Sequence, residues 1–120
     1  MRSSECELTG IGVDIVELER VRRIRFLPRF AEYFLTAWEI KSLQKTADPV
    51  SFIASRFAAK EAVIKAFPGL MKPHGFEIVK NGAKPDVRFL SPEVSDRYQA
   101  AVSISHSTEY AAGFAVIRER

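Results

Sequence analysis

The stretch from Arg56 to Phe67 constrains the fold of this chain more than any other segment. It is rich in alanine, contains neither glycine nor proline, and stops at Pro68-Gly69, which predicts a helix. At about 100° per residue, apolar side chains cover most of the helix surface on two broad faces. We therefore expect a largely buried central helix that begins at Val50 or Ser51.

Two charged residues interrupt this apolar surface. Glu61 and Lys65 are four residues apart and form a narrow polar stripe between the two apolar faces. Burying such ions costs several kcal/mol each unless they are paired or bound to something. One interpretation is an ordinary salt bridge on a half-exposed helix. The other is a cleft in which Glu61 holds a cation, with Lys65 beside it for an anion.

A carboxylate also interrupts an apolar segment near the start of the chain. Residues 9–16 alternate as a strand does, with the isoleucines and valine at 11, 13 and 15 on one face and Gly10, Gly12 and Asp14 on the other. The glycines indicate close approach by a backbone or a ligand. Aspartate is unfavourable in strands, so Asp14 is expected either at a strand edge facing water or with a partner.

The rest of the chain alternates helical and strand patterns within one expected domain, residues 1–120. Thr36-Ala-Trp-Glu39 is a capping box at the start of a helix. Asn81-Gly82 predicts a hairpin turn, and Ser91-Pro92 opens a short helix to about Gln99. Strands are predicted at 101–105 and 110–117, the last of them apolar enough for a covered or central position.

Positive charge is concentrated in one short segment. Five arginines fall within ten residues, in a chain of net charge +3 and pI near 9.2: Arg20, Arg22, Arg23, Arg25 and Arg29. This run is either a solvated helix face or a docking surface for an acidic partner. Basic and aromatic residues do not interleave as in nucleic-acid modules, so no nucleic-acid partner is expected.

The composition argues against secretion and membrane insertion. The single cysteine, Cys6, cannot form an internal disulfide, and the first residues lack the apolar core of a signal peptide. No apolar run approaches the length of a membrane span. We expect a cytoplasmic location and no membrane contact.

His106 lies beside Ser105 and Ser107 at the end of a predicted strand. Adjacent serine and histidine do not by themselves make a catalytic triad. A structural hydrogen-bonding role and a catalytic role are both open for His106.

Taken together, these motifs resemble the holo-acyl-carrier-protein synthases, the small class of 4′-phosphopantetheinyl transferases. The resemblance covers nearly the whole chain. The blocks that carry it are, in chain order, Gly10-Ile-Gly-Val-Asp-Ile-Val-Glu-Leu-Glu-Arg20, Arg29-Phe-Ala, Leu35-Thr36 with Glu39, Arg56-Phe-Ala-Ala-Lys-Glu-Ala with Lys65-Ala66, and Val102-Ser-Ile-Ser-His106 with Tyr110-Ala-Ala.

The resemblance implies a fold and a reaction. The fold class would be α+β: a small antiparallel sheet packed with a long central helix and shorter helices. The reaction would be Mg²⁺-dependent transfer of 4′-phosphopantetheine from coenzyme A to a serine of an apo acyl carrier protein, with release of 3′,5′-ADP. The resemblance also implies a homotrimer with active sites between neighbouring chains, and a homotrimer is expected here.

The resemblance also assigns roles to residues of this chain. Asp14 and Glu61 match the two metal-binding carboxylates, and Glu61, or a metal-bound water that it orients, is the candidate base. Lys65 matches a catalytic lysine near the phosphates. Arg56, Lys65, Ser105 and His106 match positions at the coenzyme site. Arg20 and Arg29 match the basic surface that docks the carrier protein.

One segment departs from the family pattern. Where the family usually has Gly-Thr-Gly after the central helix, this chain has Pro68-Gly69-Leu70. This departure is the basis of the alternative function, a member of the family that binds the carrier protein or coenzyme A without catalysis.

Overall fold

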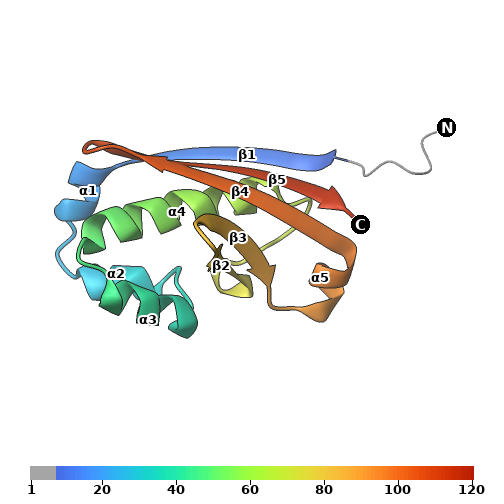
Figure 1. The fold of residues 1–120 in the computed structure, drawn as a ribbon, viewed down its shortest axis with the longest axis horizontal. Coiled ribbons are helices and arrows are strands. Elements are labelled where there is room, and N and C mark those ends of the chain that lie inside the picture. Colours follow the sequence, from blue (N-terminus) through green and yellow to red (C-terminus); the bar gives the residue numbers. More distant parts are fainter. Residues whose placement is uncertain (1–7) are drawn as a thin grey trace.

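The long helix α4 (Pro49–Ala66) lies along the inner face of an antiparallel sheet made of β1 (Leu8–Glu17), β5 (Tyr110–Glu119) and β4 (Tyr98–His106), as Figure 1 shows. The computed structural model describes residues 8–120, so the predictions about Cys6 and the first residues lie outside the described part. The remaining elements are α1 (Leu18–Arg22), α2 (Leu27–Glu32), α3 (Ala37–Lys45), the 3₁₀ turn η1 (Pro73–Gly75), β2 (Phe76–Asn81), β3 (Lys84–Phe89) and α5 (Pro92–Arg97).

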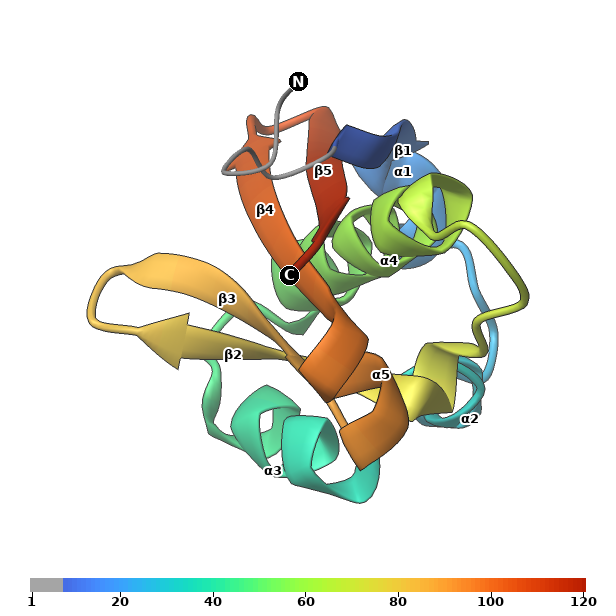
Figure 2. The same cartoon turned by 90° about the vertical axis from the view of Figure 1, so that its right-hand side faces the viewer.

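The sheet has the order β1-β5-β4, which confirms the predicted central position of the last strand. Its two hydrogen-bonded neighbours leave β5 with no free edge, whereas β1 and β4 are edge strands. The second sheet is the predicted hairpin of β2 and β3, with Gly82 at φ +69° in its turn. Figure 2 shows this hairpin extending on the β4 side of α4.

Glycines allow α4 to approach the sheet closely. A Cβ atom on Gly10 or Gly12 would overlap the backbone carbonyl oxygen of Ala66 or Ala62, respectively. On β5, a Cβ atom on Gly113 would lie 2.5 Å from the carbonyl oxygen of Ala58. The predicted close approach at the first two glycines is therefore confirmed, and the approaching group is the backbone of α4.

The opposite face of the sheet is apolar and exposed. Ile11, Val13 and Ile15 of β1 are 60%, 61% and 66% exposed, and Phe114 of β5 is 46% exposed. Val13 and Phe114 are opposite each other in the register, so the exposed side chains form a continuous patch across two strands. An exposed apolar patch of this kind marks an interaction surface.

A buried ion pair joins the helices to the hairpin. Lys60 Nζ lies 2.7 Å from Glu39 Oε1 and also donates to the carbonyl oxygens of Pro73 and Phe76, at 2.6 and 2.8 Å. The other carboxylate oxygen of Glu39 accepts from the amide of Ile78 at 2.8 Å. Burial lowers the pKa of Lys60, and the negative charge of Glu39 opposes that effect. This network fixes α4 relative to α3 and β2.

The predicted helices and strands are present, with shifts at their ends. The capping box of Thr36 and Glu39 is confirmed at the start of α3. The helix predicted from Pro92 to Gln99 ends at Arg97, because the chain enters β4 at Tyr98 and pairs there with β5. Strand β4 is accordingly longer than the predicted 101–105, since its pairing with β5 continues to His106.

Candidate active site

Asp14 of β1 lies on the inner face of the sheet, next to α4. Lys65 of α4 lies beside it, and its Nζ atom is 2.9 Å from Asp14 Oδ1 and 3.1 Å from the carbonyl oxygen of Val13. The Asp14 side chain is 17% exposed and that of Lys65 is 52% exposed. Asp14 is therefore partnered, and the alternative of an aspartate that simply faces water is wrong.

Glu61 lies one turn before Lys65 on α4 and is partly buried. Its carboxylate makes no hydrogen bond or ion pair with any residue in the described part of the chain. The simpler interpretation of the Glu61–Lys65 stripe, a salt bridge within the helix, is therefore wrong. Lys65 pairs instead with a carboxylate from a distant strand, which leaves Glu61 unneutralised.

This pair of acids suits a hard divalent cation. Within residues 8–120, no group of three or more histidine, cysteine, aspartate or glutamate side chains could hold a metal. Mg²⁺ does not need such a cage, because it takes one or two protein carboxylates and completes its shell with phosphate and water oxygens. The unpartnered carboxylate of Glu61, on the same edge of α4 as the contact with Asp14, fits this chemistry.

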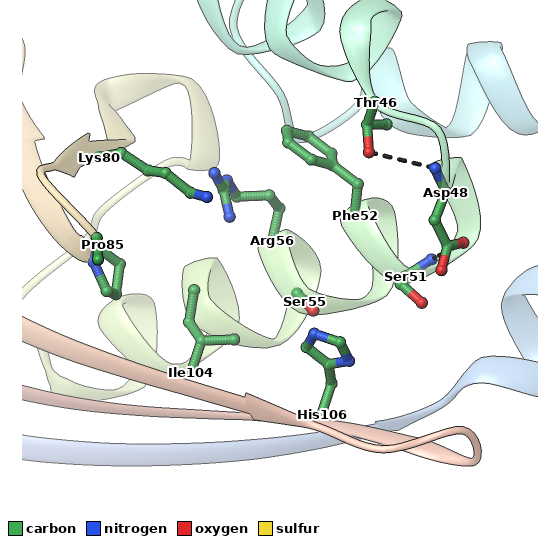
Figure 3. A pocket seen from close by; sticks show the side chains of 11 residues that line it. Thr46, Asp48, Ser51, Phe52, Ser55, Arg56, Lys80, Pro85, Ile104 and His106 are labelled. Atoms are coloured by element: carbon green, nitrogen blue, oxygen red, sulfur yellow. Dashed lines mark hydrogen bonds between the residues drawn. The ribbon is translucent and has the colours of Figure 1, made fainter.

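A second group of predicted residues lines a cavity of about 410 Å³ on another side of α4. Arg56 enters it from α4 and His106 from the end of β4, as Figure 3 shows. The floor on the α4 side includes Phe52 and Ser55. Asp48 begins α4 as its N-cap, and hydrogen bonds from Ser51 lower the pKa of its carboxylate.

Arg56 carries an uncompensated charge. The residue is 9% exposed, its guanidinium lies over the ring of Phe52 at 4.5 Å, and its Nε atom has no hydrogen-bond partner within residues 8–120. Burial lowers its pKa, and the negative charge of Glu39, which is itself paired with Lys60, opposes that effect. A buried guanidinium with a free donor is suited to an anionic ligand.

Lys80 was missed by the sequence reasoning and belongs to the same cavity. It lies on β2, and Figure 3 shows its side chain extending toward the guanidinium of Arg56. An adjoining hollow of about 380 Å³ shares Arg56 and Lys80 and adds Lys45 and Trp38. None of the residues that line this hollow is acidic. A lysine just before the Asn81-Gly82 turn was the one available signal.

Ser105 does not line the cavity with its neighbours. Ile104 and His106 both reach it, and side chains alternate along a strand, so Ser105 points to the opposite face of β4. Its assignment to the coenzyme site stays a prediction.

The two groups of residues lie at opposite edges of the sheet. Asp14 and its lysine are at the β1 edge, the cavity with His106 is at the β4 edge, and β5 runs between them. On α4, Arg56 and Glu61 are about 140° apart around the helix axis. One copy of the chain therefore does not bring all the predicted site residues into a single cavity.

The two predicted carrier-binding residues are exposed on different short helices. Arg20 lies on α1 and Arg29 on α2. Beside Arg29 is a surface hollow of about 550 Å³ that is also lined by Arg25 and Phe26, and Phe26 is 69% exposed. An exposed aromatic ring among arginines is typical of a binding surface.

Sequence comparisons place the chain in a family. Residues 10–115 match the model of the 4′-phosphopantetheinyl transferase superfamily. A holo-[acyl-carrier-protein] synthase of Chlorobium limicola is 43% identical over 115 residues, covering 89% of this chain and 91% of the relative. That of Chlorobaculum parvum is 39% identical over 115 residues, covering 90% and 97%.

Solved structures agree with these sequence matches. The crystal structure of the holo-(acyl-carrier-protein) synthase of Bacillus anthracis, in complex with CoA (3′,5′-ADP), superposes with a TM-score of 0.81 at 30% identity and covers 97% of this chain and 100% of that one. The synthase of Helicobacter pylori, in complex with coenzyme A, gives 0.73 at 29% identity, with 92% and 99% covered. The predicted α+β class is thereby confirmed. This chain belongs to the holo-[acyl-carrier-protein] synthase family of the 4′-phosphopantetheinyl transferase superfamily.

Proposed function

We propose that this chain, acting as one domain, transfers 4′-phosphopantetheine from coenzyme A to a serine of an apo acyl carrier protein and releases 3′,5′-ADP. The observation that carries the proposal is the buried, unpartnered guanidinium of Arg56 in a cavity with Lys80 and His106. Such a cavity suits the phosphates of a nucleotide. The names of the relatives supply the acceptor and the reaction class.

The proposed reaction breaks one phosphoanhydride bond and forms one phosphoester bond. The serine oxygen attacks the phosphorus that carries the pantetheine arm, and the bond from this phosphorus to the bridging oxygen breaks. The serine proton goes to a base, for which Glu61 is the candidate, and the electron pair leaves with 3′,5′-ADP. Lys65 would neutralise the charge that develops on the leaving phosphate.

Asp14 and Glu61 would hold Mg²⁺, in keeping with their oxygen donors. When bound, this ion neutralises negative charge on the pyrophosphate oxygens. Arg56 and Lys80 would anchor the nucleotide end of the donor, and the position of His106 in the same cavity makes it a further contact to that end.

We also propose that the protein is a homotrimer with its active sites between neighbouring chains. Asp14 and Glu61 lie at the opposite edge of the sheet from the cavity of Arg56, so a head-to-tail ring would bring the β1 edge of one copy to the β4 edge of the next. The exposed apolar patch around Val13 and Phe114 offers a surface for such contacts. We propose, in addition, that the protein is located in the cytoplasm.

Mixing two inactive variants tests this arrangement. Arg56→Ala disables the cavity half and Glu61→Gln the carboxylate half, so each variant alone is expected to lose transfer. If they are co-expressed in equal amounts, about a quarter of the interfaces in a random ring combine two intact halves. We expect about a quarter of wild-type transfer from the mixture, measured as carrier modified per minute.

Two controls frame that experiment. In the first control, the double variant Arg56→Ala/Glu61→Gln is mixed with wild type, so that both changes are on the same chain instead of on different chains. Size-exclusion chromatography with light scattering gives the mass of each assembly. A mixture that stays inactive while its chains do assemble together would remove the shared site from the proposal.

Removing positive charge from the proposed docking surface should weaken binding of the carrier protein. Arg20→Ala/Arg29→Ala is expected to raise the KM for the carrier protein about tenfold and to leave the KM for coenzyme A unchanged, because clustered charge attracts an acidic partner. Steady-state kinetics at two salt concentrations measures the effect, which should shrink at high salt. Lys72→Ala/Lys84→Ala, with the same loss of charge elsewhere, is the matched control.

The transfer itself is tested by mass spectrometry. The protein is incubated with coenzyme A, Mg²⁺ and a small set of apo carriers from fatty-acid and polyketide synthesis. We expect at least one carrier to gain the mass of one phosphopantetheine group. No gain with any carrier would favour the alternative, a member of the family that binds without turnover.

A further inference from the structure

Lys65 can reach two carboxylates and contacts only one of them. It follows Glu61 by four residues, the spacing at which a lysine pairs with a preceding glutamate on a helix. Its ammonium group instead lies 2.9 Å from Asp14 Oδ1, and Glu61 has no partner among residues 8–120. The site thus combines one neutralised acid with one unneutralised acid.

We propose that Lys65 is the resident counter-ion of Asp14 and competes with the divalent cation for this carboxylate. Binding of the ion then releases Lys65, whose positive charge becomes available to the phosphates of the donor. This inference rests on the metal assignment in the proposed function. It goes beyond that assignment because it states that Lys65 leaves Asp14 when the ion binds and returns when the ion leaves.

Charge is the reason that the two cations exclude each other. Asp14 is only 17% exposed, so water screens repulsion between an ammonium group and a divalent ion less well there than on an open surface. Both cations seek the oxygens of the same carboxylate. The charges of the site are better balanced when the ion binds Asp14 and Lys65 pairs with a phosphate of the donor.

Lys65 is also free to move. Its side chain is 52% exposed, and among the described residues its Nζ atom has one polar partner besides Asp14, the carbonyl oxygen of Val13. The flexible four-carbon stem can carry the ammonium group away without disturbing the helix. By contrast, Lys60 is buried with three partners and cannot exchange.

The exchange links the metal to the donor. If the ion displaces Lys65 and the donor then pairs with Lys65, each ligand should strengthen the binding of the other, by the same factor in both directions. Removing Lys65 should therefore have two opposite effects. In the absence of the donor, the ion should bind more tightly. The factor by which the donor increases the affinity for the ion should become smaller.

The test is a titration of the purified, metal-free protein with Mn²⁺, an oxygen-preferring ion that can be followed by electron paramagnetic resonance. Lys65→Met is expected to bind Mn²⁺ about tenfold more tightly than wild type in the absence of coenzyme A. Lys65→Arg keeps the counter-ion and should bind no more tightly than wild type. Lys41→Met removes an exposed lysine of α3 and controls for net charge.

Two further measurements locate the effect. Glu61→Gln should lose Mn²⁺ binding, which shows that the titration reports on this site. Added coenzyme A should tighten Mn²⁺ binding to wild type several-fold more than to Lys65→Met. Thermal melts establish that each variant is folded, and Lys65→Gln serves as a second neutral variant.

Each outcome decides the inference. Equal or weaker Mn²⁺ binding by folded Lys65→Met or Lys65→Gln overturns it, as does an absence of binding to both wild type and these variants. The transferase proposal is judged separately, by the mass of the carrier. If the wild-type protein modifies its carrier and Lys65→Met binds Mn²⁺ with unchanged affinity, this inference alone is wrong. If the wild-type protein is inactive and Lys65→Met binds Mn²⁺ more tightly, only the transferase proposal is wrong.

Discussion

Glu61→Gln is expected to reduce transfer of phosphopantetheine by about a thousandfold while the protein stays folded. The amide keeps the size of the side chain but can neither accept the serine proton nor bring negative charge to a divalent cation. Glu61 makes no hydrogen bond or ion pair with the described residues, so the thermal midpoint should change little. The rate is measured by mass spectrometry of the carrier, and circular dichroism follows the melt.

The matched control is Glu93→Gln. Glu93 is an exposed acid in the first turn of α5, an element that carries none of the predicted site residues. It loses the same charge and should transfer at the wild-type rate. Near-normal turnover by Glu61→Gln would remove Glu61 from both of its proposed roles, as base and as metal ligand.

Lys60→Met is expected to lower the free energy of unfolding by about 3–5 kcal/mol, because it leaves the carboxylate of Glu39 buried without its counter-charge. Glu39 and Lys60 are each only 1% exposed. Domains of this size are stable by about 5–15 kcal/mol, so the loss is a large share of the total. Urea denaturation followed by circular dichroism measures it.

The double variant separates the pair from its surroundings. Glu39→Gln/Lys60→Met removes both charges, and its loss should be smaller than the sum of the two single losses. Arg97→Met breaks an exposed ion pair with Glu119 and should cost only a small fraction of the loss in Lys60→Met. An unchanged denaturation midpoint for Lys60→Met would mean that this network does not hold α4 in place.

Local patterns in the sequence predicted much of the fold. The alanine-rich helix, the capping box at Thr36 and the hairpin turn at Asn81-Gly82 each depend on residues a few positions apart, and all three are present. Alternation along β1 correctly separated the apolar side chains from Asp14. It did not show which face is buried, and the glycine face rather than the apolar face turns out to cover α4.

Pairings between distant residues could not be obtained in this way. Lys65 was expected beside Glu61 and pairs instead with Asp14, from a strand 51 residues earlier in the sequence. Glu39 was expected only as part of a cap, and it also neutralises Lys60. Lys80 was marked only by its charge and its place before the Asn81-Gly82 turn, because only the arrangement of the hairpin against α4 brings it to Arg56.

The sequence by itself determined the order of helices and strands, because these depend on composition and short spacing, and its motifs carried the resemblance to the family. Only the tertiary structure decided which charges meet, since strand pairing and the crossing of α4 under the sheet set those distances. It also separated the predicted site residues between the two edges of one sheet. That separation exists because β5 lies between the edge strands, and it is what a second copy of the chain would have to bridge.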